Sequence, residues 1–421
     1  MAATAVSRPW VGVSTTRQRV MGLVFLGLAF AVWFLFSRTS SGEQVTVFNL
    51  APGAAEVTLP DWHLPTMATL NALALVAAVL GGVQLARGFG RWTNAVLGVV
   101  AGLSIFGFLV WAAADKSLNL GGLLNTSLSR AVPLTLGALS GVLCERAGVV
   151  NIAIEGMMLT GAMVGSLVGS LTDSLWIGLL AAVLSGLLLA LIHGVLSIKY
   201  KTNQIISGTV INILATGLTS YISAKFLQTY QHLNNPGIFQ PWRIPVLSRI
   251  PFLGPILFDS NMFVYAMFVL LAVIHVALFY TRWGLRLRSV GEHPKAADTL
   301  GINVFRTRYM AVMLGGMMAG FAGGYFTLGS VGRFDEVMTA GRGFISLAAM
   351  IFGNWTPFGS FGAGLLFGFA DSLASKLAIL GIQIPSEFLL MAPYVATMIV
   401  LAGVVGRGQM PAADGVPYEK E

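Results

Sequence analysis

The sequence predicts an all-α polytopic membrane protein with about 10–12 transmembrane helices, and three observations lead to this prediction. Only 10% of the 421 residues are Asp, Glu, Lys or Arg, whereas a typical soluble domain carries about 25%. Apolar residues make up 56% of the chain. Several windows exceed the roughly 18 nearly uncharged residues that indicate a membrane-spanning helix. These features exclude a soluble enzyme, because too few charges remain to cover a soluble surface.

Hydropathy predicts twelve spans, and helices are expected because lipid cannot satisfy unpaired backbone groups. Their ranges are 20–36, 66–86, 95–114, 121–143, 150–170, 174–197, 205–225, 260–280, 309–330, 343–357, 359–380 and 387–406. The alternating runs of about ten residues that a β-barrel requires do not occur. The first span is long for a cleaved signal and no A-x-A site follows it, so we expect it to be retained. The tenth is short, and it either crosses the membrane or enters it as a half-helix.

The distribution of Lys and Arg predicts the orientation. With the N-terminus inside, 16 of the 25 basic residues fall on the inner side and nine on the outer side, and the positive-inside rule favours this arrangement. Two acids, Glu155 and Asp371, then fall inside predicted spans. We expect both termini in the cytoplasm, with the excess positive charge against anionic lipid. No basic stripe interleaved with aromatic residues occurs, so no nucleic-acid partner is expected.

One loop on the expected inner side, 281–308, carries six basic residues. Within it, Pro294 favours the first turn of a short helix and Gly301 ends that helix. Helical spacing places the small or apolar residues of this helix on one face, and these are Ala296, Ala297 and Leu300. Such a helix suits a groove on another protein, or the loop is a solvated connector. On the outer side, the proline-rich loop 226–259 is expected to be irregular, and it either docks a partner or caps the bundle.

Glycines recur every four residues in several predicted spans, and small-xxx-small ladders let helix backbones approach closely. The two longest ladders, which we assign to helix packing, consist of Gly161, Gly165 and Gly169 and of Gly316, Gly320 and Gly324.

Polar residues inside predicted spans are the candidates for a substrate pathway, because burying such groups in a membrane is costly. They are Asn151, Glu155, Asn212 and Asp371. Glu155 either lines a pathway or serves as a structural cap or ion pair, for example with Arg146. Asp371 either faces an aqueous cavity or bonds to a neighbouring helix. Asn212 either lines a pathway or bonds across to a neighbour.

No motif for catalysis or nucleotide binding occurs. The chain contains no G-x-x-x-x-G-K-[ST], no complete G-x-G-x-x-G, no G-x-S-x-G and no H-E-x-x-H. Cys144 is the only cysteine and the five histidines are scattered. We therefore expect no catalytic residue, no metal site and no cofactor bound by this chain.

Two stretches resemble permeases of ABC importers for simple sugars, nucleosides and branched-chain amino acids. They are ERAGVVNIAIEGMMLTG at 145–161 and SVGEHPKAADTLGI at 289–302. Two later segments, 353–373 and 385–394, are most similar to bacterial nucleoside (guanosine-type) permeases. The resemblance covers roughly 121–406.

The resemblance implies a type II ABC-importer-like bundle, which forms a nucleoside pathway in the bacterial inner membrane. The implied coupling residues for a separate ATPase, which would bind ATP and Mg, are Gly291, Glu292, Ala296, Ala297 and Gly301. A second, distinct permease subunit and an extracytoplasmic substrate-binding lipoprotein are the other implied partners. The implied organisation is a cytoplasmic tail at 1–19, a three-span extension at 20–114, a permease core at 115–406 and a cytoplasmic tail at 407–421.

Other substrates and mechanisms stay open at this point. A sugar or branched-chain amino acid permease fits the same motifs. An ion-coupled secondary transporter would need many buried acids, and this chain offers two.

Overall fold

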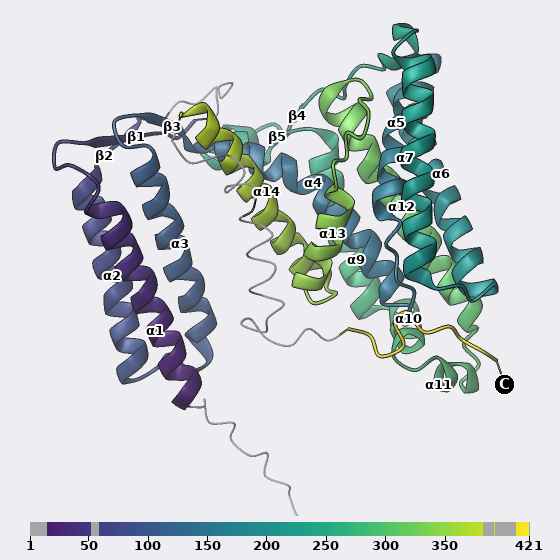
Figure 1. Cartoon of the computed structure of the whole chain (residues 1–421), viewed down its shortest axis with the longest axis horizontal. Coiled ribbons are helices and arrows are strands. Elements are labelled where there is room, and N and C mark those ends of the chain that lie inside the picture. Colours follow the sequence, from purple (N-terminus) through teal and green to yellow (C-terminus); the bar gives the residue numbers. More distant parts are fainter. Residues whose placement is uncertain (1–14, 52–58, 382–390, 392–409, 421) are drawn as a thin grey trace, which may run out of the picture. The chain divides into compact units, whose positions relative to one another are not determined.

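The computed structural model describes residues 15–51, 59–381, 391 and 410–420, and it is mainly helical, with only short strands (Figure 1). Ten helices in these ranges are long and apolar enough to cross a membrane, which confirms the predicted fold class. Residue contacts divide the chain into two units, Met1–Gly121 with Leu377–Ile382 and Gly122–Lys376 with Gln383–Glu421. Apart from residue 391, the predicted span 387–406 lies outside the described residues.

The first unit contains three long helices and a small sheet. Its helical elements are α1 (Thr15–Ala31), continued by the π-helical turns η1 (Val32–Ser37), then α2 (Thr66–Ala86), η2 (Gly90–Trp92) and α3 (Thr93–Ala112). The strands β1 (Val45–Asn49), β2 (Trp62–Pro65) and β3 (Ser117–Asn119) form a sheet in the order β2-β1-β3, with β2 antiparallel and β3 parallel to β1. Phe25 and Val100 are fully buried between the helices.

The second unit holds the rest of the described helices. The long ones are α4 (Leu120–Glu145), α5 (Ile154–Thr172), α6 (Leu175–Gly194), α7 (Gln204–Ile222), α9 (Met262–Tyr280), α12 (Val304–Gly324) and α14 (Pro357–Ile379). Shorter helices are α8 (Leu253–Leu257), α10 (Arg282–Glu292), α11 (Pro294–Thr299) and α13 (Arg342–Phe352). Further turns are η3 (Val195–Lys199), η4 (Ser223–Leu227), η5 (Gln231–Asn234), η6 (Leu247–Arg249) and η7 (Tyr325–Val331), and β4 (Trp242–Arg243) pairs antiparallel with β5 (Asp259–Ser260).

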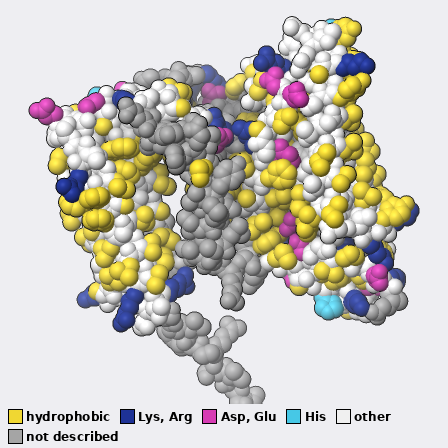
Figure 2. Space-filling model, in the orientation of Figure 1, with side chains coloured by type: hydrophobic (Ala, Val, Ile, Leu, Met, Phe, Trp, Pro, Cys, Tyr) yellow, Lys and Arg dark blue, Asp and Glu magenta, His cyan; other side chains and the backbone are white. Residues whose placement is uncertain are grey.

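Burial separates the inner helices of this unit from the outer ones. In their most apolar windows α4 is 89% buried, α12 78% and α5 72%, against 33% for α6 and α7. The exposed side chains of the outer helices are large and apolar, for example Leu180, Leu184 and Leu188 of α6. In Figure 2, hydrophobic side chains cover the flanks of the helices and Lys and Arg gather toward their ends. This pattern is typical of helices whose flanks face lipid.

The two glycine ladders lie where α5, α6 and α12 meet. A Cβ on Gly161 would lie 2.7 Å from the Gly320 carbonyl oxygen, and one on Gly320 would collide with the Ala182 carbonyl oxygen. A Cβ on Gly316 would collide with the Ala190 side chain. The three backbones approach so closely that only hydrogen fits between them, as small-residue interfaces in membranes require.

The tenth predicted span is a half-helix. α13 has 11 residues, or about 16 Å at 1.5 Å per residue, whereas a bilayer core is about 30 Å thick. It follows an irregular segment at 332–341. The apolar run 343–357 is therefore a short helix and a turn, and it does not cross a membrane as one helix.

The sequence-based charge tally was wrong at Arg130. That tally placed Arg130 with the nine basic residues on the outer side, but the structure places it on α4, inside a predicted span. The predicted spans therefore hold basic residues besides their two acids, since Lys225 of η4 and Lys376 of α14 also fall within them.

Candidate functional site

The α10–α11 hairpin is held by two side-chain caps and a terminal glycine at one end of the second unit, which we call the hairpin end (Figure 1). The Thr281 hydroxyl accepts from the Gly284 amide (3.1 Å) at the start of α10, and His293 Nδ1 accepts from the Ala296 amide (3.1 Å) at the start of α11. Gly301 has φ +80°, a conformation that favours glycine and ends the hairpin. The imidazole of His293 thus caps α11 as an Asn side chain would.

The residues of α11 do not share one face as the spacing predicted. Ala297 is 2% exposed and packs with Val290, Val304 and Tyr418, whereas Leu300 is 81% exposed and Ala296 is exposed. The reason is that consecutive helix positions lie about 100° apart, so Ala296 and Ala297 point in different directions. The chain then turns at Leu300, which lies beyond the helix. The surface that a partner could contact therefore comprises Ala296 and Leu300.

The other two predicted coupling residues connect the hairpin to the rest of the chain. Gly291 lies against the backbone of the turn after α4, where a Cβ would collide with the Arg146 carbonyl oxygen. Glu292 is exposed, and its Oε2 accepts from the Ala412 amide (3.2 Å).

Asn151 and Asn212 both hold the backbone around the start of α5. The Asn151 side chain is fully buried and accepts from the Ala153 amide (3.1 Å). Asn212 reaches over from α7, where it accepts from the Gly156 amide (2.8 Å) and donates to the Ile152 carbonyl (2.9 Å). With these bonds made, neither amide faces an open pathway in this conformation.

Glu155 caps the half-helix α13 from the neighbouring helix α5. Its Oε1 accepts from the Thr339 hydroxyl (2.6 Å) and the Gly341 amide (2.9 Å), and its Oε2 accepts from the Gly343 amide (2.5 Å). A carboxylate at a helix N-terminus is stabilised by the unpaired amides there. Arg146, the partner considered from the sequence, instead donates to the Trp355 carbonyl (2.9 Å).

Asp371 belongs to a cluster of charges that the fold assembles inside the bundle. Arg130 Nη1 of α4 lies 2.8 Å from Asp371 Oδ1, and Arg342 Nη2 of α13 lies 3.7 Å from Asp371 Oδ2. The side chains of Arg130, Asp371 and Arg342 are 30%, 29% and 32% exposed. Half-exposed charges on membrane-spanning helices avoid lipid and face water or protein. Of the four polar candidates, Asp371 is the one with a partly exposed side chain, whereas Asn151, Glu155 and Asn212 are buried.

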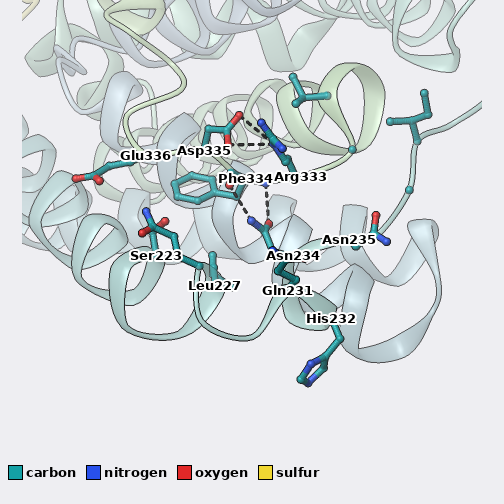
Figure 3. Close-up of a pocket in the computed structure, with 15 residues that line it drawn as sticks. Ser223, Leu227, Gln231, His232, Asn234, Asn235, Arg333, Phe334, Asp335 and Glu336 are labelled. Carbon is teal, nitrogen blue, oxygen red and sulfur yellow. Dashed lines mark hydrogen bonds and ion pairs between the residues drawn. The ribbon is translucent and has the colours of Figure 1, made fainter.

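The end of the unit opposite the hairpin carries a cavity of about 870 Å³ (Figure 3). It lies between the η4–η5 segment and the residues after η7, and Asn234 joins the two: its amide donates to the Phe334 carbonyl (2.8 Å) and accepts from the Phe334 amide (2.7 Å). Arg333 and Asp335 form an ion pair (3.2 Å) at the rim. The lining is mostly polar and suits a hydrated solute or a polar partner surface.

Sequence reasoning missed several of these contact residues. The charge of Arg130 inside an apolar run was a usable signal. Thr339 and Tyr418 gave none, because a single Thr or Tyr outside a predicted span is not unusual.

Comparison with known proteins adds to this geometry. Residues 123–405 match the family model described as branched-chain amino acid transport system / permease component. The chain belongs to this family. It is therefore a multi-pass permease subunit, and the predicted resemblance to such permeases is confirmed.

Curated relatives of the permease are named for several solutes. It is 42% identical to the guanosine ABC transporter permease protein NupQ of Bacillus subtilis over 70% of this chain and 95% of that one. Identity is 41% to the nucleoside ABC transporter permease protein NupC of Lactococcus lactis, over 69% of this chain and 94% of the relative. Identity is 35% to a putative glucose ABC transporter permease protein of Haloferax volcanii, over 60% of this chain and 76% of the relative. No solved structure matches the permease significantly.

Proposed function

We propose that the permease forms the translocation pathway of an ATP-driven importer for nucleosides. The observation that carries the substrate class is the 42% and 41% identity to the guanosine and nucleoside permeases, which extends over almost their whole length. A glucose permease is also related, at 35% identity over a shorter part of the chain. Sugar therefore remains the alternative substrate, and the experiment must distinguish uptake of a nucleoside from uptake of a sugar.

The α10–α11 hairpin is the proposed contact with a separate ATPase subunit, which binds ATP and Mg²⁺. Its exposed tip presents one methyl group at Ala296 and one apolar side chain at Leu300. A small, capped and convex element of this kind fits a groove on another protein, where its apolar tip supplies most of the contact energy. On this proposal, the hairpin end lies in the cytoplasm of a bacterium and the chain lies in the inner membrane.

The cluster of Arg130, Asp371 and Arg342 is the proposed polar lining of the pathway, which runs between this chain and a second, distinct permease subunit. Two guanidinium groups and one carboxylate give the cluster only one net charge, so it suits a polar but uncharged solute. A guanidinium presents paired N–H donors, and the O6 and N7 acceptors of guanine match that spacing. In this proposal Asn151, Glu155 and Asn212 hold in place the backbone that borders the pathway, at the starts of α5 and α13.

The polar cavity at the opposite end is the proposed place where an extracytoplasmic lipoprotein delivers the solute. Its rim combines a cation and two acids, Arg333, Asp335 and Glu336. Charges of both signs at a rim select a complementary partner more than they add affinity.

The test is reconstitution of the permease with its partner permease, ATPase and lipoprotein in vesicles. ATP-dependent uptake of radiolabelled guanosine is expected, with little uptake of ribose, glucose or leucine. Vesicles that lack only the ATPase are the matched control. Preferred uptake of a sugar or of leucine would overturn the nucleoside assignment, and uptake by the permease alone under a sodium or proton gradient would overturn the ATP-driven mechanism.

A further inference from the structure

We propose that residues 410–420 form a strap that positions the α10–α11 hairpin and ties it to the end of α4, so that motion of the hairpin reaches the half-helix α13. The proposal rests on the proposed function, because the motion is that imposed by an ATPase on the hairpin. Tyr418 and Asp414 are its positioning residues.

The strap is bonded to the hairpin through its backbone. The Ala412 amide donates to Glu292 Oε2 (3.2 Å), and the Ala413 amide donates to the Gly291 carbonyl (2.9 Å). Both acceptors lie in the last turn of α10, immediately before the cap of α11. The strap therefore holds the base of the hairpin and leaves the exposed tip at Ala296 and Leu300 open.

Tyr418 fills the apolar space under α11. Its side chain is 5% exposed and packs with Val290 of α10, Ala297 of α11 and Val304 of α12. The Phe305 ring lies 5.3 Å from the Tyr418 ring, centroid to centroid. A single aromatic side chain of the strap thus joins three successive helices, and without it Ala297 would lose a large part of its packing.

The middle of the strap is joined to α4 and α12 instead. Asp414 is 8% exposed and lies within electrostatic reach of Glu145, the last residue of α4, and of Arg308 of α12. Arg308 Nη1 donates to the Val416 carbonyl (2.9 Å). The strap passes so close to Gly148 that a Cβ there would lie 3.0 Å from the Ala413 carbonyl oxygen.

From α4 the contacts continue to the half-helix. Glu145 Oε2 accepts from Trp355 Nε1 (2.6 Å), and Arg146 donates to the Trp355 carbonyl (2.9 Å). Trp355 lies in the turn after α13, whose other end is capped by Glu155. The hairpin, the strap, the end of α4 and α13 are thus joined by continuous contacts.

The experiment compares variants in the reconstituted transporter, and it measures solute transported per ATP hydrolysed. Tyr418→Ala and deletion of 410–421 are expected to lower this ratio at least fivefold, with the ATPase subunit still bound and basal hydrolysis retained. Tyr418→Phe keeps the ring and is expected to restore the ratio. Val416→Ala is the matched control, because its side chain is 51% exposed on the same strap.

A second measurement keeps the proposal testable if Tyr418→Ala does not assemble. Glu292→Cys with Ala412→Cys, joined by a short bis-methanethiosulfonate through reducible disulfides, holds the strap on the hairpin in place of the lost Glu292 bond, and the proposal expects the ratio to be at least that of the same double variant before cross-linking. A ratio that collapses on cross-linking and returns on reduction would overturn the proposal, because the strap would then have to release. An unchanged ratio in both Tyr418→Ala and the deletion would also overturn it.

Failure of the proposed function is a separate outcome. If the wild type takes up a sugar or leucine instead of guanosine, the nucleoside assignment fails, and the same variants are compared with that solute. If uptake needs no ATPase, the ratio has no meaning and both proposals fail together.

Discussion

Glu155 and Gly343 are joined across two helices by a hydrogen bond of 2.5 Å from the Gly343 amide to the Glu155 carboxylate. A Cβ on Gly343 would lie 2.5 Å from the Glu155 Cα, so glycine is needed for this approach. The contact places the positive end of the α13 dipole on a carboxylate that α5 supplies. An acid inside an apolar helix is thus explained by the half-helix beside it.

Glu155→Gln is expected to destabilise the permease, because the amide NH₂ group would face backbone N–H donors. The loss is about 1–3 kcal/mol, the usual cost of leaving buried donors unpaired. Thermal unfolding in detergent measures it, with Glu336→Gln, an exposed acid, as the control. Equal melting temperatures for the two variants would contradict the cap.

Gly161→Ala is expected to destabilise the packing of α5 against α12, because the new Cβ would lie 2.7 Å from the Gly320 carbonyl oxygen. Overpacking of this kind costs about 1–3 kcal/mol. The control is Gly217→Ala on α7, where a Cβ meets nothing within 4 Å. That change should be neutral or stabilise the helix by up to about 1 kcal/mol. Similar unfolding curves for both variants would show that the ladder tolerates bulk.

Asp371→Asn is expected to lower guanosine uptake at least tenfold, because Arg130 and Arg342 lose their counter-charge inside the bundle. Uptake kinetics in the reconstituted transporter measure the effect, and Asp371→Glu should retain part of the activity. The double variant Arg130→Asp with Asp371→Arg exchanges the two charges. It is expected to recover some uptake if the main role of the ion pair is to hold the helices together. Full activity of Asp371→Asn would remove the cluster from the pathway.

Ala296→Trp is expected to abolish stimulation of the ATPase by the permease while the melting temperature stays within about 1 °C. The reason is that Ala296 is exposed, so bulk there meets only a partner. Ala297→Trp is the matched contrast, because that residue is 2% exposed and a larger side chain should lower the melting temperature. Stimulation that survives Ala296→Trp would place the ATPase contact elsewhere.

Docking of the strap is expected to weaken as the pH rises from 5 to 8. Burial raises the pKa of Asp414 from 3.8 to about 6, and the Glu145 carboxyl and the Arg308 guanidinium face it. Because the docked state binds the proton more tightly, the contribution of this proton to docking is full below the ordinary pKa of 3.8 and is lost as the pH rises through about 6.

Hydrogen exchange of the Ala412 and Ala413 amides, corrected for the intrinsic pH dependence, measures docking. Asp414→Asn should keep their protection constant across the same range. A wild-type protection that is equally constant would show that Asp414 does not control docking.

The sequence predicted most of the helices for a simple physical reason. Spans are encoded locally, because about 20 apolar residues in a row have few alternatives to a membrane helix. The short helix α11 (Pro294–Thr299) was also predictable, because its start signal, Pro294, and its stop signal, Gly301, lie within a few residues of each other. The glycine spacing likewise indicated close packing before its partners were known.

The polar residues of the spans were identified but not interpreted, because their partners lie far away in the chain. Glu155 meets 339–343 and Asp371 meets Arg130. No local pattern distinguishes an acid that caps a distant half-helix from one that faces a solute.

By itself, the sequence determined that this chain is a helical membrane protein, ten of the segments that are long and apolar enough to span a membrane, and the permease family to which it belongs. Composition, apolar run length and family motifs are local properties, so no coordinates were needed. Only the tertiary structure decided that Glu155, Asn151 and Asn212 hold backbone, that Ala297 is turned inward, and that 410–420 lies on the hairpin. Those outcomes depend on which donors, acceptors and apolar surfaces meet in space. In several cases the partners are more than a hundred residues apart in the chain, so only folding brings them together.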